Sequence, residues 1–342
     1  MGVAPDADAF RTALTAWFSL HGRDYPWRRT HDPYAILVSE VMLQQTQIAT
    51  VLGKGYFTRF LDAFPDLCAL AAADDPALLK AWEGLGYYRR ARMLRETARA
   101  VLTHHHGIFP QDLDALMMLP GIGRYTAGAL RAFAWNLPAV LVDGNVSRVL
   151  SRVCNSTAPV DDPAGIKRIW SWAATLADPD CPQIYHAALM ELGQILCRPG
   201  VPDCFNCPVA HLCRAVEPTQ LPVKIRKTQI TQVDEHALWM RNHNGHLLLH
   251  HEGGKRRTGL WKLPTRDVSE IAHLPILTDL YYTITRYRVH LRVHDGNALG
   301  GPTFPPAIDE SWQSMDQLAA LPMAAPFRRI VGRLLEDSGN RV

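Results

Sequence analysis

Four cysteines lie within residues 197–213, and thiolates at this spacing can bind a metal. Six, two and five residues separate successive cysteines, so all four can reach one centre without help from the rest of the fold. Zinc ribbons usually use two close Cys-x-x-Cys pairs, whereas one such pair flanked by wider loops suits a [4Fe–4S] cubane. On spacing alone, zinc stays an alternative to iron–sulfur. The predicted metal ligands are Cys197, Cys204, Cys207 and Cys213.

Asp143 is a candidate for an ionised catalytic carboxylate. It lies in PAVLVDGNVSRVL, just before a helix that we expect to start near Asn145. Free backbone amides and the helix dipole stabilise a negative charge at such a position. A plain N-cap is the alternative, because such caps are common.

Glu40 is a candidate for a carboxyl group that is held neutral. Asp32 is the expected N-cap of its helix, and the residues that share its helical face are Ile36, Leu43 and Gln47. Glu40 then interrupts an apolar stripe, and burial there favours the uncharged acid and raises the pKa of Glu40. One neutral and one ionised carboxyl are what cleavage of a glycosidic bond requires. A purely structural role is the alternative.

A glycine-rich turn within residues 116–133 is a candidate anion site. The sequence LMMLPGIGRYTAGALRAF predicts a helix stopped by Pro120, a turn, and a second helix. Gly121 and Gly123 permit positive φ and the close approach of another backbone. Amides of the turn and of the second helix then point at one place, which favours a phosphate. The alternative is an ordinary packing corner between two helices.

The elements that carry these residues predict a multidomain protein. Apolar residues recur at helical spacing through residues 1–215, so this part is predicted to be all-α. A polar segment with two prolines follows and is predicted to be a linker. Beyond it, an α+β part is expected. Its strands lie around an Asn-Gly turn in QVDEHALWMRNHNGHLLLHH and in YYTITRYRVHLRVHD, and its helices lie in SMDQLAALPM and FRRIVGRLLEDS.

Composition sets broad limits on this protein. A chain of 342 residues is long enough for two or three domains. Its formal net charge is only +3, so a DNA-binding surface must come from local placement of Arg and Lys. Cys68, Cys154 and Cys181, outside the cluster, are expected to be small buried hydrophobic residues. We recognise no secretory signal and no membrane span, and expect a cytoplasmic, nucleoid-associated protein.

Five segments resemble a known family in their order along the chain: SEVMLQQTQ, GLGYYRRAR, LPGIGRYTAG, LVDGNVSRV and the cysteine loop. They closely resemble MutY adenine DNA glycosylases of the helix–hairpin–helix superfamily, which includes endonuclease III. The resemblance implies a catalytic domain at 1–216 with a [4Fe–4S] cluster, a linker at 217–229 and a Nudix-like domain at 230–342. It also implies two helical lobes with a DNA-binding cleft that holds a flipped-out base.

The resemblance implies catalytic roles for four residues. Glu40 would be the general acid that protonates adenine N7, and it would help to position the water. Asp143 would stabilise the oxocarbenium-like sugar, with a covalent intermediate as an option. Tyr125 would support this pair, and Asn145 would order the site. The endonuclease III branch has a lysine at the Tyr125 position that forms a Schiff base with the sugar, so we expect a monofunctional enzyme.

The resemblance also implies contacts with DNA. Gln45 and Tyr87 match positions that push into the duplex, where an amide can replace lost pairing and a ring can wedge between bases. Burial is the alternative for both, and it is the favoured interpretation for Tyr88. The predicted DNA-binding residues of the helical part are Arg28, Gln45, Tyr87, Gly121 and Gly123.

The segment GLWKLP at 259–264 resembles the Gly-Leu-Trp segment of the Nudix-like domain with which MutY proteins sense 8-oxoguanine. No cluster of glutamates follows, so we expect a reader of the lesion and not a nucleotide hydrolase. Thr285 and Arg286 are the predicted lesion contacts, through a hydroxyl donor and a guanidinium. They depart from the aromatic-hydroxyl-His loop of the family, and Ala187 stands where a glutamine is expected.

We therefore expect a monomeric enzyme that acts on duplex DNA and has no membrane partner. It would remove adenine mispaired with 8-oxoguanine or guanine, by base flipping and acid-catalysed hydrolysis of the N-glycosidic bond. One alternative is a related glycosylase with a different mispair or base preference. Another is a non-catalytic iron–sulfur protein that binds lesions, although Glu40 and Asp143 argue against it.

Overall fold

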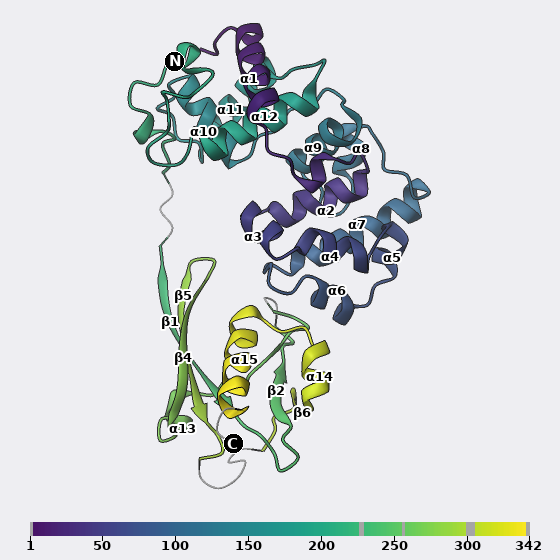
Figure 1. The fold of residues 1–342 in the computed structure, drawn as a ribbon, viewed down its shortest axis with the longest axis vertical. Coiled ribbons are helices and arrows are strands. Elements are labelled where there is room, and N and C mark those ends of the chain that lie inside the picture. Colours follow the sequence, from purple (N-terminus) through teal and green to yellow (C-terminus); the bar gives the residue numbers. More distant parts are fainter. Residues whose placement is uncertain (1–2, 226–228, 255–256, 299–304, 340–342) are drawn as a thin grey trace. The chain divides into compact units, whose positions relative to one another are not determined.

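The computed structural model describes residues 3–225, 229–254, 257–298 and 305–339 (Figure 1). The chain divides into two compact units, each made of segments that are separate in sequence. Unit 1 comprises Met1–Gln47, Asp66–Cys68 and Glu96–Lys227, and unit 2 comprises Ile48–Pro65, Ala69–Arg95 and Thr228–Val342. The predicted boundaries at 1–216, 217–229 and 230–342 follow the sequence and stay a prediction. The contact units do not follow these boundaries, because the helical segments Ile48–Pro65 and Ala69–Arg95 belong to unit 2.

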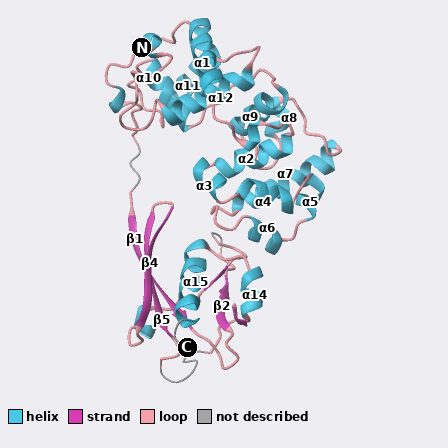
Figure 2. Ribbon diagram, in the orientation of Figure 1, coloured by secondary structure: helices cyan, strands magenta, loops and turns pink. Residues whose placement is uncertain are grey.

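Unit 1 is built from helices (Figure 2). They are α1 (Ala7–His21), α2 (Pro33–Leu43), α8 (Leu113–Met117), α9 (Arg124–Trp135), α10 (Gly144–Val153), α11 (Pro163–Leu176) and α12 (Pro182–Ile195), with 3-10 turns at Pro26–Arg28, Ala210–Leu212 and Pro218–Gln220. Helices α1, α10, α11 and α12 enclose one apolar core that includes Leu14, Val149 and Tyr185. A second contact, between α2 and α9, brings together the helices that carry Glu40 and Tyr125.

Unit 2 contains further helices and two small sheets. Its helices α3 (Ile48–Gly53), α4 (Tyr56–Ala63) and α6 (Asp75–Ala81) precede the strands, and α5 (Leu67–Ala72) and α7 (Arg89–His105) begin or end in unit 1. The strands are β1 (Thr231–Trp239), β2 (Leu247–His251), β3 (Trp261–Lys262), β4 (Ile276–Ile284), β5 (Tyr287–Asp295) and β6 (Glu310–Gln313). Their orders are β1-β5-β4 and β3-β2-β6. Helices α13 (Val268–Ile271), α14 (Met315–Ala320) and α15 (Ala325–Gly339) complete the unit.

The predicted fold classes are confirmed. Among the described residues up to 225 no strand occurs, and the residues after 229 form an α+β region. The two strands around Asn244-Gly245 are present, but β1 pairs with β5 and β2 pairs with β3 and β6, so they belong to different sheets. The β-type run at 281–295 is the greater part of an antiparallel hairpin of β4 and β5.

Burial tests the expectation for the cysteines outside the cluster. Of the cysteines outside the cluster, Cys154 is buried as expected, whereas Cys68 and Cys181 are exposed, so the expectation is wrong for these two. Within the described part of the chain, no helix is both long enough and apolar enough to cross a membrane.

Candidate active site

Glu40 lies on a helix that is buried on every side. The Asp32 carboxylate caps this helix as predicted, accepting hydrogen bonds from the amides of Tyr34 (3.0 Å) and Ala35 (3.3 Å). Every residue from Tyr34 to Met42 is buried, so the expected apolar stripe is wrong. Helix α2 also ends at Leu43, and Gln47 is therefore not on the Glu40 face of the helix.

The carboxyl group of Glu40 keeps its proton to a higher pH than an exposed glutamate does. Only 8% of the residue is exposed, and burial raises the pKa of Glu40 to about 7. The negative charge of Asp143 raises this pKa further, and a hydrogen bond with Tyr125 acts in the opposite direction. Because a charge effect requires proximity, Glu40 and Asp143 face a common region of unit 1.

Tyr125 connects the two carboxyl groups. It lies in the first turn of α9, and its hydroxyl is hydrogen-bonded to Glu40 and 3.5 Å from the sulfur of Met190. Burial and the charges of Glu40 and Asp143 raise its pKa well above the ordinary value. Tyr125 is therefore a neutral phenol that can donate a hydrogen bond. Met190, which the sequence reasoning missed, lines this site.

Asp143 is the N-cap of α10, as its sequence predicts. Its Oδ1 accepts a hydrogen bond from the amide of Val146 (2.7 Å), and its Oδ2 accepts one from Nδ2 of Asn145 (2.9 Å). Both carboxylate oxygens of Asp143 therefore have a hydrogen-bond donor. The predicted catalytic residues Glu40, Tyr125, Asp143 and Asn145 thus belong to one connected site.

Arg148 supports this site and was missed from sequence. Its Nη2 donates to Oδ1 of Asn145 (2.9 Å) and to the carbonyl of Gly193 (2.7 Å), and its Nε donates to the carbonyl of Cys197 (2.8 Å). A Cβ atom on Gly193 would lie 2.8 Å from the Cβ of Asn145, so α10 and α12 approach closely here. The sequence did contain a signal for Arg148. It follows Asn145 by three residues, and residues three apart on a helix share a face.

The four clustered cysteines line one cavity of about 150 Å³. Burial raises the pKa of Cys207 to about 11, and the three other clustered thiols act in the same direction. Nη1 of Arg152 lies 3.3 Å from Sγ of Cys197 and also donates to the carbonyl of Arg198 (2.8 Å). Within the described ranges, no three Cys, His, Asp or Glu side chains converge to hold a single metal ion. The cavity thus has four thiols around a space larger than one ion needs.

The glycine-rich turn joins α8 and α9 as predicted. Gly121 adopts a positive φ of 77°, and Gly123 is the N-cap of α9 with φ of −94°. Of these two glycines, only Gly121 thus adopts the positive φ that glycine permits. Both glycines are exposed, which leaves their amides accessible, and their contact with phosphate stays a prediction.

Gln45 and Tyr87 are both exposed, so the alternative that they are buried is wrong. Each has a positive φ, 59° for Gln45 and 46° for Tyr87. A non-glycine residue in this region costs about 1–3 kcal/mol and persists only where the surroundings enforce it. Tyr88 is buried, as favoured from sequence.

The remaining predicted DNA contacts differ in their surroundings. Arg28 forms an ion pair with buried Glu191 and lies 4.7 Å from the ring centroid of Tyr25, so its guanidinium already has partners. Thr285 and Arg286 form the exposed tip of the β4–β5 hairpin, where Thr285 has φ of 53°. Their roles in binding stay predictions.

This site can be compared with known proteins. The family described as HhH-GPD superfamily base excision DNA repair protein matches residues 38–173, a range that contains Glu40, Tyr125, Asp143 and Asn145. The adenine DNA glycosylase of Mycolicibacterium smegmatis is 40% identical over 202 residues, and the match covers 59% of this chain and 67% of that protein. The chain belongs to the adenine DNA glycosylase family.

Other relatives extend this assignment. The adenine DNA glycosylase of Mus musculus is 42% identical over 224 residues, and the match covers 63% of this chain but only 43% of the mouse protein. The chain thus spans less than half of that relative. A solved thermostable thymine-DNA glycosylase has a TM-score of 0.56 at 28% identity, and it covers 62% of this chain and 96% of its own. The helical part of this chain therefore has the fold of this superfamily.

Ionisation of Glu40 should destabilise the folded protein. The pKa of Glu40 is raised from 4.5 to about 7 on folding, so the folded state holds the proton more tightly than the unfolded state. Stability from this group is then complete at low pH and is lost as the pH rises through about 7. We expect Glu40→Gln to raise the free energy of unfolding, relative to wild type, by up to roughly 3 kcal/mol more at pH 8 than at pH 5.

Urea unfolding at both pH values measures this difference. Glu96→Gln removes a glutamate that is 45% exposed and paired with Arg99, and it serves as the matched control. Equal effects of Glu40→Gln at pH 5 and pH 8 would contradict the raised pKa.

Proposed function

We propose that this protein is a monofunctional adenine DNA glycosylase of base excision repair that acts on duplex DNA with a mispaired adenine. The observation that carries the proposal is the buried carboxyl of Glu40, whose pKa is raised to about 7 and which is hydrogen-bonded to Tyr125 and close to the charge of Asp143. This is the division into an acid and an anion that glycosidic cleavage needs. The family assignment supports the same chemistry.

Glu40 is the general acid of the proposed reaction. The adenine must leave the base stack before its glycosidic bond can be reached. The carboxyl proton of Glu40 passes to adenine N7, and the bond between the sugar C1′ and N9 breaks with its electron pair going to the base. Water then adds to C1′ and releases a proton, so the products are adenine and an abasic site.

Asp143 and Tyr125 assist this step in different ways. The carboxylate of Asp143 stabilises the positive charge that develops on the sugar, and its hydrogen bonds from Asn145 and Val146 hold it in place. Tyr125 orients the Glu40 carboxyl through its hydroxyl. Because the phenol of Tyr125 has no amine with which to form a Schiff base, the reaction stops at the abasic site.

Replacing the acid tests this mechanism. We expect Glu40→Gln to lower the single-turnover excision rate about 10²–10⁴-fold while duplex binding is retained, because only the proton donor is lost. The wild-type rate should fall as the pH rises above about 7, where Glu40 becomes ionised. Alkali-labile sites in the adenine strand measure excision, and Glu96→Gln is the control. Unchanged excision in Glu40→Gln would refute the mechanism.

We propose that the cysteine cavity holds a [4Fe–4S] cluster through Cys197, Cys204, Cys207 and Cys213. Four thiols line the cavity, and the mutual repulsion of their thiolates would be removed by a cationic iron centre. Four sulfurs that bind one tetrahedral zinc ion lie within about 4 Å of one another. Among the described residues, no three side chains of the metal-binding types come together in this way. The proposed cluster holds together the loop that Arg148 and Arg152 of α10 contact, and it has no part in the proton transfer.

Metal analysis decides between iron and zinc. We expect a brown protein with about four iron atoms per chain and no stoichiometric zinc. Cys204→Ser should lose iron and visible absorption, whereas Cys181→Ser, an exposed cysteine outside the loop, should retain both. Stoichiometric zinc in freshly purified wild-type protein would refute the iron–sulfur assignment.

We further propose that residues 230–342 form a Nudix-like reader of 8-oxoguanine, with Thr285 and Arg286 at its hairpin tip. Support comes from the GLWKLP segment and from the exposure of the tip, which leaves both side chains accessible. A glycosylase with relaxed mispair preference is the second candidate. Ala187 favours it, because this buried residue carries no polar group with which to read a base.

A panel of mispairs separates the two candidates. We expect excision of adenine opposite 8-oxoguanine to be about tenfold faster than opposite guanine, because a site that hydrogen-bonds one base loses about 1–3 kcal/mol with another. Arg286→Ala should reduce this ratio, whereas Arg288→Ala, an exposed arginine of β5 beyond the tip, should not. Equal rates opposite both bases would favour the relaxed enzyme.

A further inference from the structure

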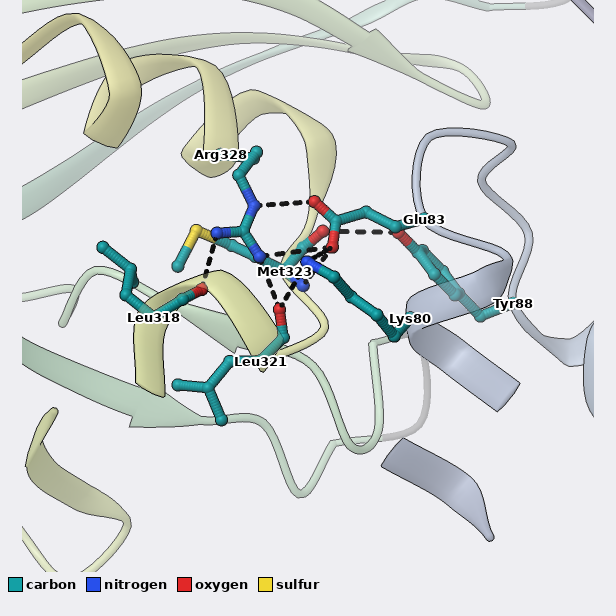
Figure 3. A network of polar contacts seen from close by, with 7 residues as sticks. All are labelled: Lys80, Glu83, Tyr88, Leu318, Leu321, Met323 and Arg328. Carbon is teal, nitrogen blue, oxygen red and sulfur yellow. Dashed lines mark hydrogen bonds and ion pairs between the residues drawn. The ribbon is translucent and has the colours of Figure 1, made fainter. Parts of the chain in front are cut away.

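The loop between α6 and α7 is held at both ends by one segment of the C-terminal region. At its start, the carboxylate of Glu83 accepts two hydrogen bonds from Arg328, from Nε (2.7 Å) and Nη2 (3.2 Å), as Figure 3 shows. It also accepts a hydrogen bond from the amide of Met323 (3.3 Å) and one from Lys80 (3.2 Å). At its end, the hydroxyl of Tyr88 donates to the carbonyl of Met323 (3.4 Å). Both ends thus bind the backbone of a single residue.

The partners of the loop are themselves fixed. Arg328 donates to the carbonyls of Leu318 (2.8 Å) and Leu321, and Nζ of Lys80 donates to the same Leu321 carbonyl (3.4 Å). The side chain of Glu83 is 15% exposed and that of Arg328 is 28% exposed. A bidentate pair within a shielded network is stronger than an isolated surface pair.

Met323 connects this network to the Gly-Leu-Trp segment. It forms a parallel bridge with Trp261, whose amide donates to the carbonyl of Pro322 (2.9 Å). The same segment rests on the helices, because a Cβ on Gly259 would lie 2.9 Å from a methyl of Leu79 and 3.1 Å from Nη2 of Arg92. Residues 259–261 and the loop therefore share one rigid support.

Tyr87 is the exposed tip of this loop. Its side chain projects from a backbone with φ of 46°, and the residue is 46% exposed. The guanidinium of Arg90 lies 5.6 Å from its ring centroid and donates to the carbonyls of Leu85 (3.0 Å) and Gly86 (3.2 Å). A Cβ on Gly84 would overlap the hydroxyl of Tyr56 at 2.0 Å. A strained conformation of this kind needs support from its surroundings.

We propose that Glu83 and Arg328 are positioning residues for Tyr87, and that C-terminal residues 321–328 hold it ready to wedge into the duplex. This inference rests on the proposed glycosylase function. Its consequence is that the lesion-reading region and the wedge move as one body. The free energy that the C-terminal region gains on binding DNA can then contribute to extrusion of the base, because this region and Tyr87 move together.

Hydrogen exchange in the DNA-free protein tests the support itself. Glu83→Gln removes the negative charge and one of the two acceptor oxygens that Arg328, Lys80 and Met323 share, and we expect amides of residues 84–90 to exchange about tenfold faster. The matched control is Glu310→Gln, which disrupts a similar bidentate pair with Arg266 in the same unit and does not touch the loop. Unchanged exchange of residues 84–90 in Glu83→Gln would overturn the proposal.

Base extrusion tests the consequence. A duplex with 2-aminopurine in place of the target adenine, opposite 8-oxoguanine, reports extrusion by its fluorescence. We expect Glu83→Gln and Tyr87→Ala each to lower the extrusion equilibrium about fivefold to tenfold, and the double variant to be no worse than Tyr87→Ala, because both changes act through one element. Arg328→Lys, which keeps the charge but not the bidentate geometry, should behave like Glu83→Gln.

The outcomes separate this inference from the function on which it rests. Additive losses in the double variant, or normal extrusion by Glu83→Gln, would overturn the positioning role while wild-type excision continued. Absence of both extrusion and excision in the wild-type protein, with the fold intact, would overturn the proposed function and this inference together.

Discussion

The constraint on which unit 1 depends is the burial of one carboxyl group beside another. Burial disfavours the ionised form of Glu40, and the nearby charge of Asp143 adds a smaller effect, so the pKa of Glu40 is raised. The position of each carboxyl group in the structure determines which one keeps its proton to a higher pH. Glu40 comes from the middle of a helix that is buried throughout, whereas Asp143 comes from the start of α10, where an amide and a side-chain donor face it.

Helix α10 is the element that holds the site in place. It presents Asp143 at its first turn, Arg148 one turn later and Arg152 near its end, and both arginines bind the beginning of the cysteine loop. The cysteine loop therefore supports the helix that orients the anion. If the proposed cluster is bound there, its role is structural, because the loop contacts the helix that begins at Asp143.

In unit 2, contacts between distant residues likewise support one side chain, that of Tyr87. Tyr87 has an unfavourable backbone conformation, and the contacts of its loop come from residues more than two hundred positions away. The division of the chain into contact units reflects this packing, because helices α4 and α6 belong with the C-terminal strands and not with α2. In the proposed function, the unit with the neutral acid performs the reaction and the other unit carries the wedge and the reader.

The sequence by itself determined the features that depend on neighbouring residues. Asp32 and Asp143 cap their helices as predicted, the turn at Gly121 has its positive φ, and the spacing of the cysteines brings all four to one cavity. Each of these is a local interaction, in which chain connectivity alone brings the partners together. The raised pKa of Glu40 was also anticipated, because a carboxylate in an apolar segment is unfavourable wherever that segment is buried.

Tertiary structure decided the features that join distant segments. The Tyr125–Glu40 hydrogen bond, the bonds of Arg148 to Gly193 and Cys197, and the pairing of β1 with β5 all connect residues far apart in sequence. The complete burial of α2 and the support of Tyr87 by Met323 and Arg328 are of the same kind. No periodicity or spacing encodes such contacts, because they arise only when whole elements pack and each buried polar group must find a partner.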